Sequence, residues 1–180
     1  MKAVKFHTPR GVIELARTWL LYREAFPRCE RKPFSIILSM AKTEKTDLWY
    51  FEDKDGFAGM CATINGTDKI LIDYLAVSKK RRGKGLGTKM LKELLKHYEG
   101  YGVFLEIEML DPNNPISIRR REFYVRAGFE PMNTYADVFG VNMELLGSGC
   151  HLTFDEYREF YRTNYGEFAY NHIKAINDNK

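Results

Sequence analysis

A glycine-rich, basic turn is the first feature of this sequence that could do chemistry. Gly83, Gly85 and Gly87 alternate with other residues soon after the apolar run 70–77. Glycine has no Cβ atom, so successive main-chain N–H groups in such a turn can converge on an anion. The amphipathic pattern that follows predicts a helix, whose first N–H groups are unpaired and whose dipole is positive at this end. The turn therefore predicts a cradle for phosphate groups.

The spacing of the glycines decides which phosphate ligand fits best. A Walker A loop needs a glycine, four residues and then Gly-Lys-Ser/Thr, and the turn cannot be placed in that register. The dinucleotide fingerprint G-x-G-x-x-G fails because the third glycine follows the second by two residues instead of three. Residues 82–87 do fit Arg/Gln-x-x-Gly-x-Gly/Ala, which resembles the acyl-CoA-binding motif of the GNAT superfamily of N-acyltransferases. Taken alone, this hexapeptide could equally be a basic surface turn.

A second motif, about forty residues further on, carries the same resemblance. Residues 121–131, Arg-Glu-Phe-Tyr-Val-Arg-Ala-Gly-Phe-Glu-Pro, are similar to the FYxxxGF-x-P segment with which GNAT proteins end their next helix. A predicted strand, residues 103–110, lies between the two motifs. The resemblance extends to about Gly147 and leaves out roughly the last thirty residues.

The resemblance implies that an amine attacks the thioester of acetyl-CoA directly, with acetyl-CoA as cosubstrate and no metal. The end of the strand before the turn would bind the pantetheine arm and polarise the thioester carbonyl, and the turn would bind the pyrophosphate. The predicted cofactor-binding residues are Leu75, Ala76, Val77, Arg82, Gly83, Lys84, Gly85, Leu86, Gly87, Thr88, Ser117 and Tyr124.

Two of these residues lie on the second predicted helix. Tyr124 matches the tyrosine that in many GNAT proteins donates a proton to the leaving sulfur, and the alternative is that it only packs beside Phe123. Many family members carry an asparagine seven or eight residues before this tyrosine, where this chain has Ile116 and Ser117. We expect Ser117 either to replace that cofactor contact or to cap the helix.

Three carboxylates are the candidates for the general base. Asp73 interrupts one apolar strand, and Glu106 and Glu108 interrupt the other, on one face by two-residue alternation. A carboxylate in a largely buried strand is unfavourable unless it is paired or functional, so we expect at least one of the three to act in catalysis. The alternatives are a proton relay through water and structural pairing. The expected structural partners are Arg119, Arg120 and Lys69.

Composition limits the other classes of protein. A chain of 180 residues with 44% hydrophobic residues favours one sizeable core. No apolar stretch approaches the ~20 residues of a spanning helix, so we expect no membrane association. The cysteines, Cys29, Cys61 and Cys150, are far apart and no secretory signal precedes them, which predicts reduced thiols and a cytoplasmic location. The four histidines show no metal-ligand spacing.

The net charge of +4 is modest and largely local. The basic residues expected at the cofactor phosphates are Lys79, Lys80, Arg81, Arg82 and Lys84. Such a cluster, with the arginines at 119–121, could also bind nucleic acid. We rank that function below cofactor binding and expect no nucleic-acid partner.

Periodicity predicts the elements that hold these residues. Strands are expected at residues 3–7, 48–51, 57–64, 70–77, 103–109, 133–139 and 141–146, and helices at 12–25, 34–41, 86–98 and 116–127. The first helix is expected to bury Val12, Leu15, Ala16, Trp19 and Leu20, and the third to bury Leu86, Met90, Leu91, Leu94, Leu95 and Tyr98. Strands 70–77 and 103–109 are expected to be parallel because a helix connects them.

The predicted fold class is α/β (α+β), a GNAT-like mixed central sheet of about seven strands flanked by helices, with an extra C-terminal helix. Residues 1–150 would form the N-acetyltransferase domain, and 151–180 an aromatic helical extension. The extension begins with a capping box, Thr153-Phe154-Asp155-Glu156. We expect it to pack on the same domain or on a partner subunit, which would make a homodimer.

The sequence thus predicts an N-acetyltransferase that acts on a primary amine. The amine could be a small metabolite, a drug, a peptide N-terminus or a lysine, and the sequence does not choose. The alternative from another class is a non-catalytic acyl-CoA-binding regulatory module that keeps the cradle without a competent acid and base.

Overall fold

The structure is a computed structural model that describes residues 4–176. The described residues divide into two compact units, residues 4–65 with 72–99 and residues 66–71 with 100–176. The fold is mixed α/β, with eight strands in the described part, mostly antiparallel and flanked by helices. The predicted fold class is confirmed. The eighth strand, which the sequence did not predict, lies in the C-terminal extension.

The first unit contains the glycine turn. Its strands are β1 (Lys5–His7), β2 (Thr46–Asp53), β3 (Gly56–Asn65) and, from residue 72 on, β4 (Lys69–Val77), neighbours in that order. Its helices are α1 (Gly11–Ala25), α2 (Phe34–Ala41) and α3 (Leu86–His97), with short 3₁₀ turns η1 (Arg28–Glu30) and η2 (Lys79–Arg81). Of the first predicted strand, Ala3 lies outside the described residues.

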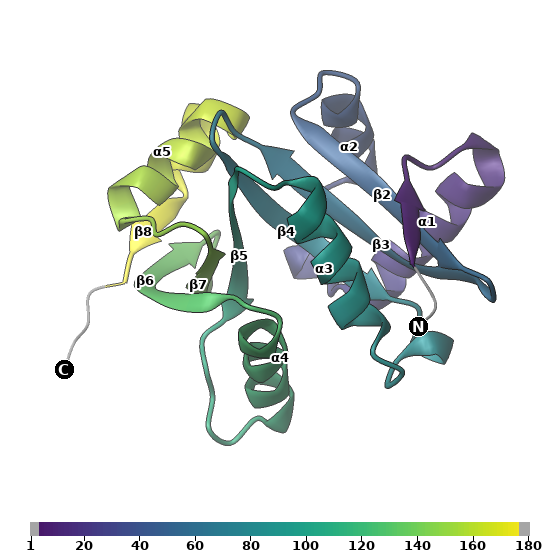
Figure 1. Cartoon of the computed structure of the whole chain (residues 1–180). Coiled ribbons are helices and arrows are strands. Elements are labelled where there is room, and N and C mark those ends of the chain that lie inside the picture. The colour runs from purple at the N-terminus through teal and green to yellow at the C-terminus, as the bar shows by residue number, and fades with distance from the viewer. Residues whose placement is uncertain (1–3, 177–180) are drawn as a thin grey trace. The chain divides into compact units, whose positions relative to one another are not determined.

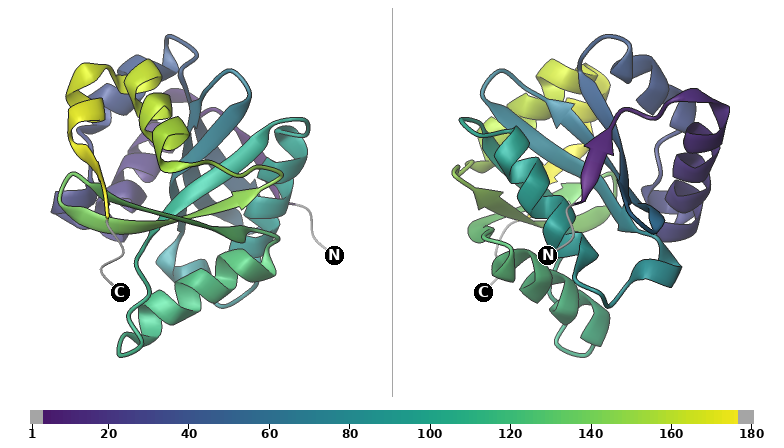
Figure 2. Two further views of the ribbon diagram at one scale, coloured as in Figure 1. Left: turned by 90° about the vertical axis from the view of Figure 1, so that its left-hand side faces the viewer. Right: turned by 45° about the vertical axis from the view of Figure 1, so that its right-hand side comes forward.

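Helices cover both faces of this sheet (Figures 1 and 2). α1 and α2 share one core with side chains of β2, β3 and β4, including Tyr22, Ile37 and Met60. α3 covers the other face and buries Leu86, Met90, Leu91 and Leu94, as predicted, with Tyr98 just beyond its end. Leu95, predicted for the same face, is half-buried. The close contact of α3 depends on Gly59 in β3, where a Cβ atom would lie 2.3 Å from the Ala76 carbonyl oxygen and 2.8 Å from Met90 Cε.

The predicted buried face of α1 is wrong. The helix forms where expected, but Val12 is 83% exposed and Leu20 is 57% exposed. The residues it buries are Thr18, Leu21 and Tyr22. Apolar residues occur on several sides of this helix, so periodicity alone could not select a face. Thr18 is tolerated inside because its hydroxyl donates a hydrogen bond to the Glu14 carbonyl oxygen at 2.9 Å.

The second unit has its own strand order, β5-β7-β6-β8. These strands are β5 (Gly102–Glu108), β6 (Glu130–Val138), β7 (Val141–Ser148) and β8 (Ile173–Ala175), and every pair among them is antiparallel. The helices are α4 (Pro115–Arg126), α5 (Phe154–Tyr165) and the short α6 (Glu167–Asn171). Figure 2 shows α4 and α5 on opposite faces of this sheet.

The C-terminal extension packs within this second unit. α5 lies against the face of β5 that carries Phe104, whose ring is 5.0 Å from that of Phe160. β8 extends the sheet by pairing with β6, so that Ile173 is opposite Val138. A three-residue strand is too short to leave a clear alternation in the sequence, which explains why it was not predicted. The domain boundary at residue 150 stays a prediction.

Candidate active site

The N-terminus of α3 is open where the phosphate cradle was predicted. Gly85 is the N-cap residue, with φ of 71°, and the end of the helix has no side-chain cap. The first hydrogen bond of the helix runs from the Lys89 N–H to the Gly85 carbonyl oxygen at 3.3 Å. The N–H groups of residues 86–88 therefore precede the internal ladder. Gly83 also has a positive φ, 73°, a conformation that other residues adopt at a cost.

The basic residues around the cradle are not all available to a ligand. Lys79, Lys80, Arg82 and Lys84 are exposed. Arg81, which was counted among the phosphate-binding charges, instead places Nη2 2.7 and 2.6 Å from the two carboxylate oxygens of Asp53. Its expected role is therefore corrected: Arg81 fastens the turn to the β2–β3 hairpin.

The end of β4, predicted to bind the pantetheine arm, is shaped by the same turn. The Val77 carbonyl oxygen accepts a hydrogen bond from Arg82 Nε at 3.0 Å. Leu75 and Val77 are half-buried, whereas Ala76 is buried on the side of α1 and α2. The strand thus holds its last residues in fixed positions beside the cradle. Their contacts with a cofactor stay predictions.

Asp73 has a partner that sequence reasoning missed. Lys32 Nζ lies 2.7 and 2.8 Å from the two carboxylate oxygens of Asp73, whose side chain is 7% exposed. The main-chain N–H of Lys32 also donates to the Tyr74 hydroxyl at 3.1 Å. Burial, and then the negative charge of Asp73, raises the pKa of Tyr74 above its ordinary value. Lys32 and Asp73 therefore form an ion pair in which one ammonium contacts both carboxylate oxygens.

Glu106 is held by the C-terminal extension. The hydroxyls of Tyr157 and Tyr161 both donate to Glu106 Oε1, each at 2.7 Å. Tyr157 is completely buried, and Glu106 is half-buried. Glu108, two residues further along β5, instead forms an ion pair with Arg120, one of the partners expected for these carboxylates. Lys69 pairs with Asp68 and with none of the three.

Tyr124 lies in the last turn of α4. Its half-buried ring contacts those of Phe123 and Phe129, with centroids 5.0 and 6.0 Å away. Its carbonyl oxygen accepts hydrogen bonds from the N–H groups of Ala127 and Phe129 at 3.0 and 3.1 Å. The Gly-Phe pair of the motif thus closes the helix around Tyr124. The role of Tyr124 as a catalytic acid stays a prediction.

The start of α4 corrects one of the two expectations for Ser117. The cap is Asn114, whose side-chain oxygen accepts a hydrogen bond from the Ile116 N–H at 3.0 Å. The buried Ser117 hydroxyl is bonded to the loop, and it donates to the Asn114 and Asp111 carbonyl oxygens at 2.9 and 3.1 Å. Asparagine is a strong helix cap, which is the signal that could have found it. The contact of Ser117 with a cofactor stays a prediction.

A further buried carboxylate, Glu144 on β7, was also missed. Its side chain is 4% exposed and accepts from Arg121 Nε, at 3.0 Å, and from Arg121 Nη2, at 3.1 Å. The hydrogen bonds to this carboxylate raise the pKa of Arg121. Arg121 therefore anchors α4 to the sheet through an ion pair. No group of three or more side chains among the described residues could hold a metal ion.

The fold and the matching domain define a class of protein. Residues 44–131 match the family model of the acetyltransferase (GNAT) domain. Residues 44–131, which include both motifs, are therefore similar to a GNAT acetyltransferase domain, and the resemblance of the two motifs is confirmed. No helix within residues 4–176 is both long enough and apolar enough to cross a membrane.

Particular relatives are similar over different shares of the chain. YjbC of Bacillus subtilis (strain 168), described as an acetyltransferase, is 32% identical over 107 residues, which are 59% of this chain and 53% of that protein. The match thus spans about half the length of this curated relative.

Two solved structures show the same fold. A GNAT-family acetyltransferase from Bacteroides thetaiotaomicron has a TM-score of 0.75 at 20% identity, covering 91% of this chain and 98% of that one. Spermidine N-acetyltransferase of Vibrio cholerae, solved with CoA and spermine, has a TM-score of 0.64 at 11% identity, covering 80% and 94%. At these identities the comparison concerns the fold alone.

Proposed function

We propose that this protein is an N-acetyltransferase that transfers the acetyl group of acetyl-CoA to a primary amine. The observation that carries the proposal is the uncapped N-terminus of α3, where Gly83 and Gly85 adopt positive φ among exposed lysines and an arginine. An anion is stabilised at such a helix end by unpaired N–H groups and by the dipole. The CoA bound by the Vibrio cholerae relative of the same fold supports this choice of ligand.

The proposed reaction balances without a metal. The amine nitrogen attacks the thioester carbon, the C–S bond breaks, and the products are an amide and free CoA. Main-chain groups of Leu75 and Val77 bind the pantetheine arm, and the N–H groups of the cradle bind the pyrophosphate. Tyr124 gives a proton to the leaving thiolate, because a tyrosine hydroxyl with pKa near ~10 is protonated at neutral pH.

Glu106 is the carboxylate that we propose as proton acceptor for the amine. Asp73 holds the ammonium of Lys32 with both oxygens, and Glu108 pairs with a guanidinium, so both already neutralise a cation. Glu106 accepts hydrogen bonds from the hydroxyls of Tyr157 and Tyr161, which fix the position of its Oε1 atom. Neutral donors orient a carboxylate without cancelling its charge.

A substitution at Thr88 tests the cradle. Thr88 is the third residue of α3 and half-buried, so Thr88→Glu places a carboxylate among the predicted phosphate-binding groups. A carboxylate in the first turn favours the helix, so the variant should fold normally. We expect its Kd for acetyl-CoA to rise about tenfold or more, by charge repulsion. Calorimetric titration measures this. Thr88→Gln is the matched control and should bind acetyl-CoA like the unaltered protein. Equal affinity of both variants for acetyl-CoA would show that the cradle does not bind the cofactor phosphates.

Turnover separates the enzyme from a regulatory module. Release of the CoA thiol is followed with acetyl-CoA and a broad panel of primary amines. Tyr124→Phe should lower kcat by about 10²-fold or more and leave the Kd for acetyl-CoA within about twofold, because the hydroxyl acts in the chemical step. Tight acetyl-CoA binding with no turnover across the panel would instead establish the non-catalytic module.

Location and assembly belong to the proposal as well. The thiols of Cys61 and Cys150 are free, which supports a cytoplasmic location, and the side chain of Cys29 lies outside what the structure describes. Homodimer formation stays a prediction. Association with DNA or RNA that coenzyme A does not displace would favour the nucleic-acid alternative.

A further inference from the structure

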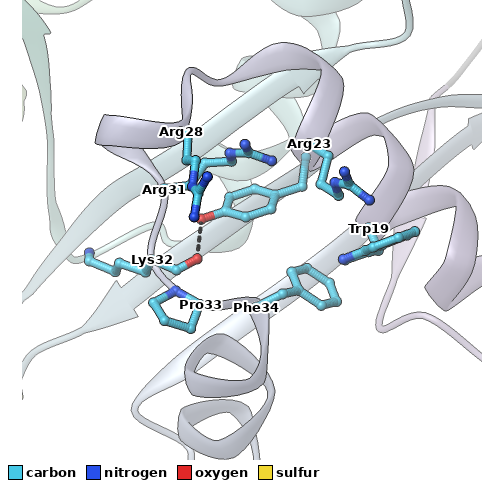
Figure 3. Close-up of a pocket in the computed structure, with 8 residues that line it drawn as sticks. Trp19, Arg23, Arg28, Arg31, Lys32, Pro33 and Phe34 are labelled. Carbon is cyan, nitrogen blue, oxygen red and sulfur yellow. Dashed lines mark hydrogen bonds between the residues drawn. The ribbon is translucent and has the colours of Figure 1, made fainter.

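A basic, aromatic pocket lies in the first unit. It has a volume of about 360 Å³ and opens between α1, the η1 turn and the start of α2. The residues that line it are Trp19, Tyr22, Arg23, Arg28, Arg31, Lys32, Pro33 and Phe34. Figure 3 shows Arg28 and Arg31 together on one side, Arg23 with Trp19 on the other, and Pro33 and Phe34 below them. Ligand sites of small molecules have volumes of this order.

Three of the four cationic side chains that line this pocket are arginines. Arg23, Arg28 and Arg31 form no ion pair with a carboxylate in the part of the chain that the structure describes. Arg23 stacks over Trp19, with Cζ 4.7 Å from the ring centroid. Three guanidinium groups around one pocket repel one another, and an anion inside it would relieve that repulsion.

Arg31 gives a second, independent indication. Its Nε atom is buried and has no hydrogen-bond partner among the described residues. Buried donors in folded proteins are almost always paired, so an unpaired guanidinium donor in a pocket wall indicates a missing acceptor. Carboxylate and phosphate groups match the guanidinium fork.

The pocket is connected to the proposed cofactor strand. Lys32, in its wall, is bonded through its Nζ to Asp73 and through its main-chain N–H to the Tyr74 hydroxyl, both on β4. Leu75 follows Asp73 by two residues, or roughly 7 Å along the strand. Through Lys32, the pocket wall is therefore bonded to the strand whose last residues are predicted to bind the cofactor.

We propose that the pocket binds the carboxylate or phosphate group of the amine acceptor, which makes the substrates of this protein amines that also carry a negative charge. The aromatic walls favour a flat, apolar body between the two groups. This inference rests on the proposed function and deepens it. It also predicts a different preference from that of the Vibrio cholerae relative, because polyamines such as spermine would be repelled by the arginines.

Matched pairs of amines test the inference. For a carboxylate, 4-(aminomethyl)benzoate is compared with benzylamine, and for a phosphate, tyramine O-phosphate is compared with tyramine. We expect kcat/KM for at least one anionic member to exceed that of its neutral partner by about tenfold or more, and spermidine to be a poor acceptor. The pair with the larger ratio identifies the anion. Equal values within both pairs, or a preference for spermidine, would overturn the inference.

Arginine variants localise the effect. Arg31→Gln should raise KM for the preferred anionic amine about tenfold and leave the neutral amine unchanged. Arg28→Gln, at an exposed position, should act in the same direction if Arg31→Gln fails to fold. Arg10→Gln is the matched control on the surface of the same unit and should change neither. An equal loss of rate with the anionic amine and its neutral partner would mean that these arginines do not bind the anionic group.

A binding measurement separates this inference from the proposed function. Trp19 lines the pocket, so its fluorescence in a Trp49→Phe background reports occupancy. The probes are the N-acetyl derivatives of 4-(aminomethyl)benzoate and benzylamine. Selective binding of the anionic probe without turnover of any amine would contradict the proposed N-acetyltransferase function and support anion binding in the pocket. Turnover of neutral amines with no selective binding of the anionic probe would support the N-acetyltransferase function and overturn the anion-binding inference.

Discussion

At the scale of single residues, three acidic side chains that look alike in the sequence have different partners in the structure. Asp73, Glu106 and Glu108 are held by an ammonium, two tyrosine hydroxyls and a guanidinium, respectively. The sequence marked all three for the same reason, an acidic residue in an apolar strand. Glu106 accepts hydrogen bonds from two tyrosine hydroxyls of the C-terminal extension, and it is the carboxylate that we propose as the base.

The tyrosine donors to Glu106 can be tested one at a time. Tyr157→Phe removes one of two hydroxyls from a half-buried carboxylate, because Tyr157 is wholly buried and donates at 2.7 Å. We expect the free energy of unfolding to fall by about 1.5–3 kcal/mol, as for hydrogen bonds to charged groups. Urea denaturation measures this. Tyr101→Phe, at a 46% exposed position, is the control and should change it little. A Tyr157→Phe variant as stable as the control would contradict the contact.

At the scale of elements, the helices α5 and α3 differ in how their N-terminal N–H groups are capped. α5 satisfies its own end: the Thr153 hydroxyl accepts from the Glu156 N–H, and Glu156 accepts from the Thr153 N–H at 2.8 Å. α3 begins at Gly85 with no side-chain cap. A free helix end beside exposed cations is a cost to the folded chain unless a ligand occupies it. The contrast supports a ligand at α3 and a structural role for α5.

The capping box predicts a pH-dependent stability. The hydrogen bonds from Thr153, the main-chain N–H first, hold the pKa of Glu156 below its usual value of 4.5. A lowered pKa in the folded state stabilises the protein above the usual pKa, and this stabilisation is lost as the pH falls through the folded value. Thr153→Ala keeps the main-chain hydrogen bond to Glu156 and removes the one from the hydroxyl, so it should lower the free energy of unfolding at pH 7 and lower it less toward acidic pH.

Urea unfolding followed by circular dichroism at neutral pH and at several acidic values measures this difference. Glu156→Gln serves as the comparison, since it removes the titrating group and should flatten the pH dependence of the capping effect. A Thr153→Ala penalty that stays constant, or grows on acidification, would show that Glu156 is not coupled to the cap.

At the scale of the whole molecule, the distribution of charge matters more than its sum. The chain has 28 basic and 24 acidic residues, and several arginines neutralise buried or half-buried acids. The first unit leaves positive charge at two places, the cradle at the start of α3 and the pocket beside α1. These are the two places where we propose that anionic groups bind. A modest net charge of +4 conceals this arrangement.

The local features of this protein were determined by its sequence. The glycine turn, most of the buried face of α3 and the capping box of α5 were predicted and found. Each depends on residues within a few positions of one another, because turns, caps and helix faces are governed by main-chain conformation and short-range hydrogen bonds.

Only the tertiary structure decided which distant residues meet. Lys32 and Asp73 are 41 positions apart, and Tyr157 and Glu106 are 51 apart. The exposed face of α1 and the close approach at Gly59 also follow from how elements pack, not from any local pattern. Long-range contacts depend on which faces are brought together, and one sequence pattern is compatible with several such choices. The phosphate cradle could therefore be predicted from the sequence. The partners of Asp73, Glu106 and Glu108, and the basic pocket, could not.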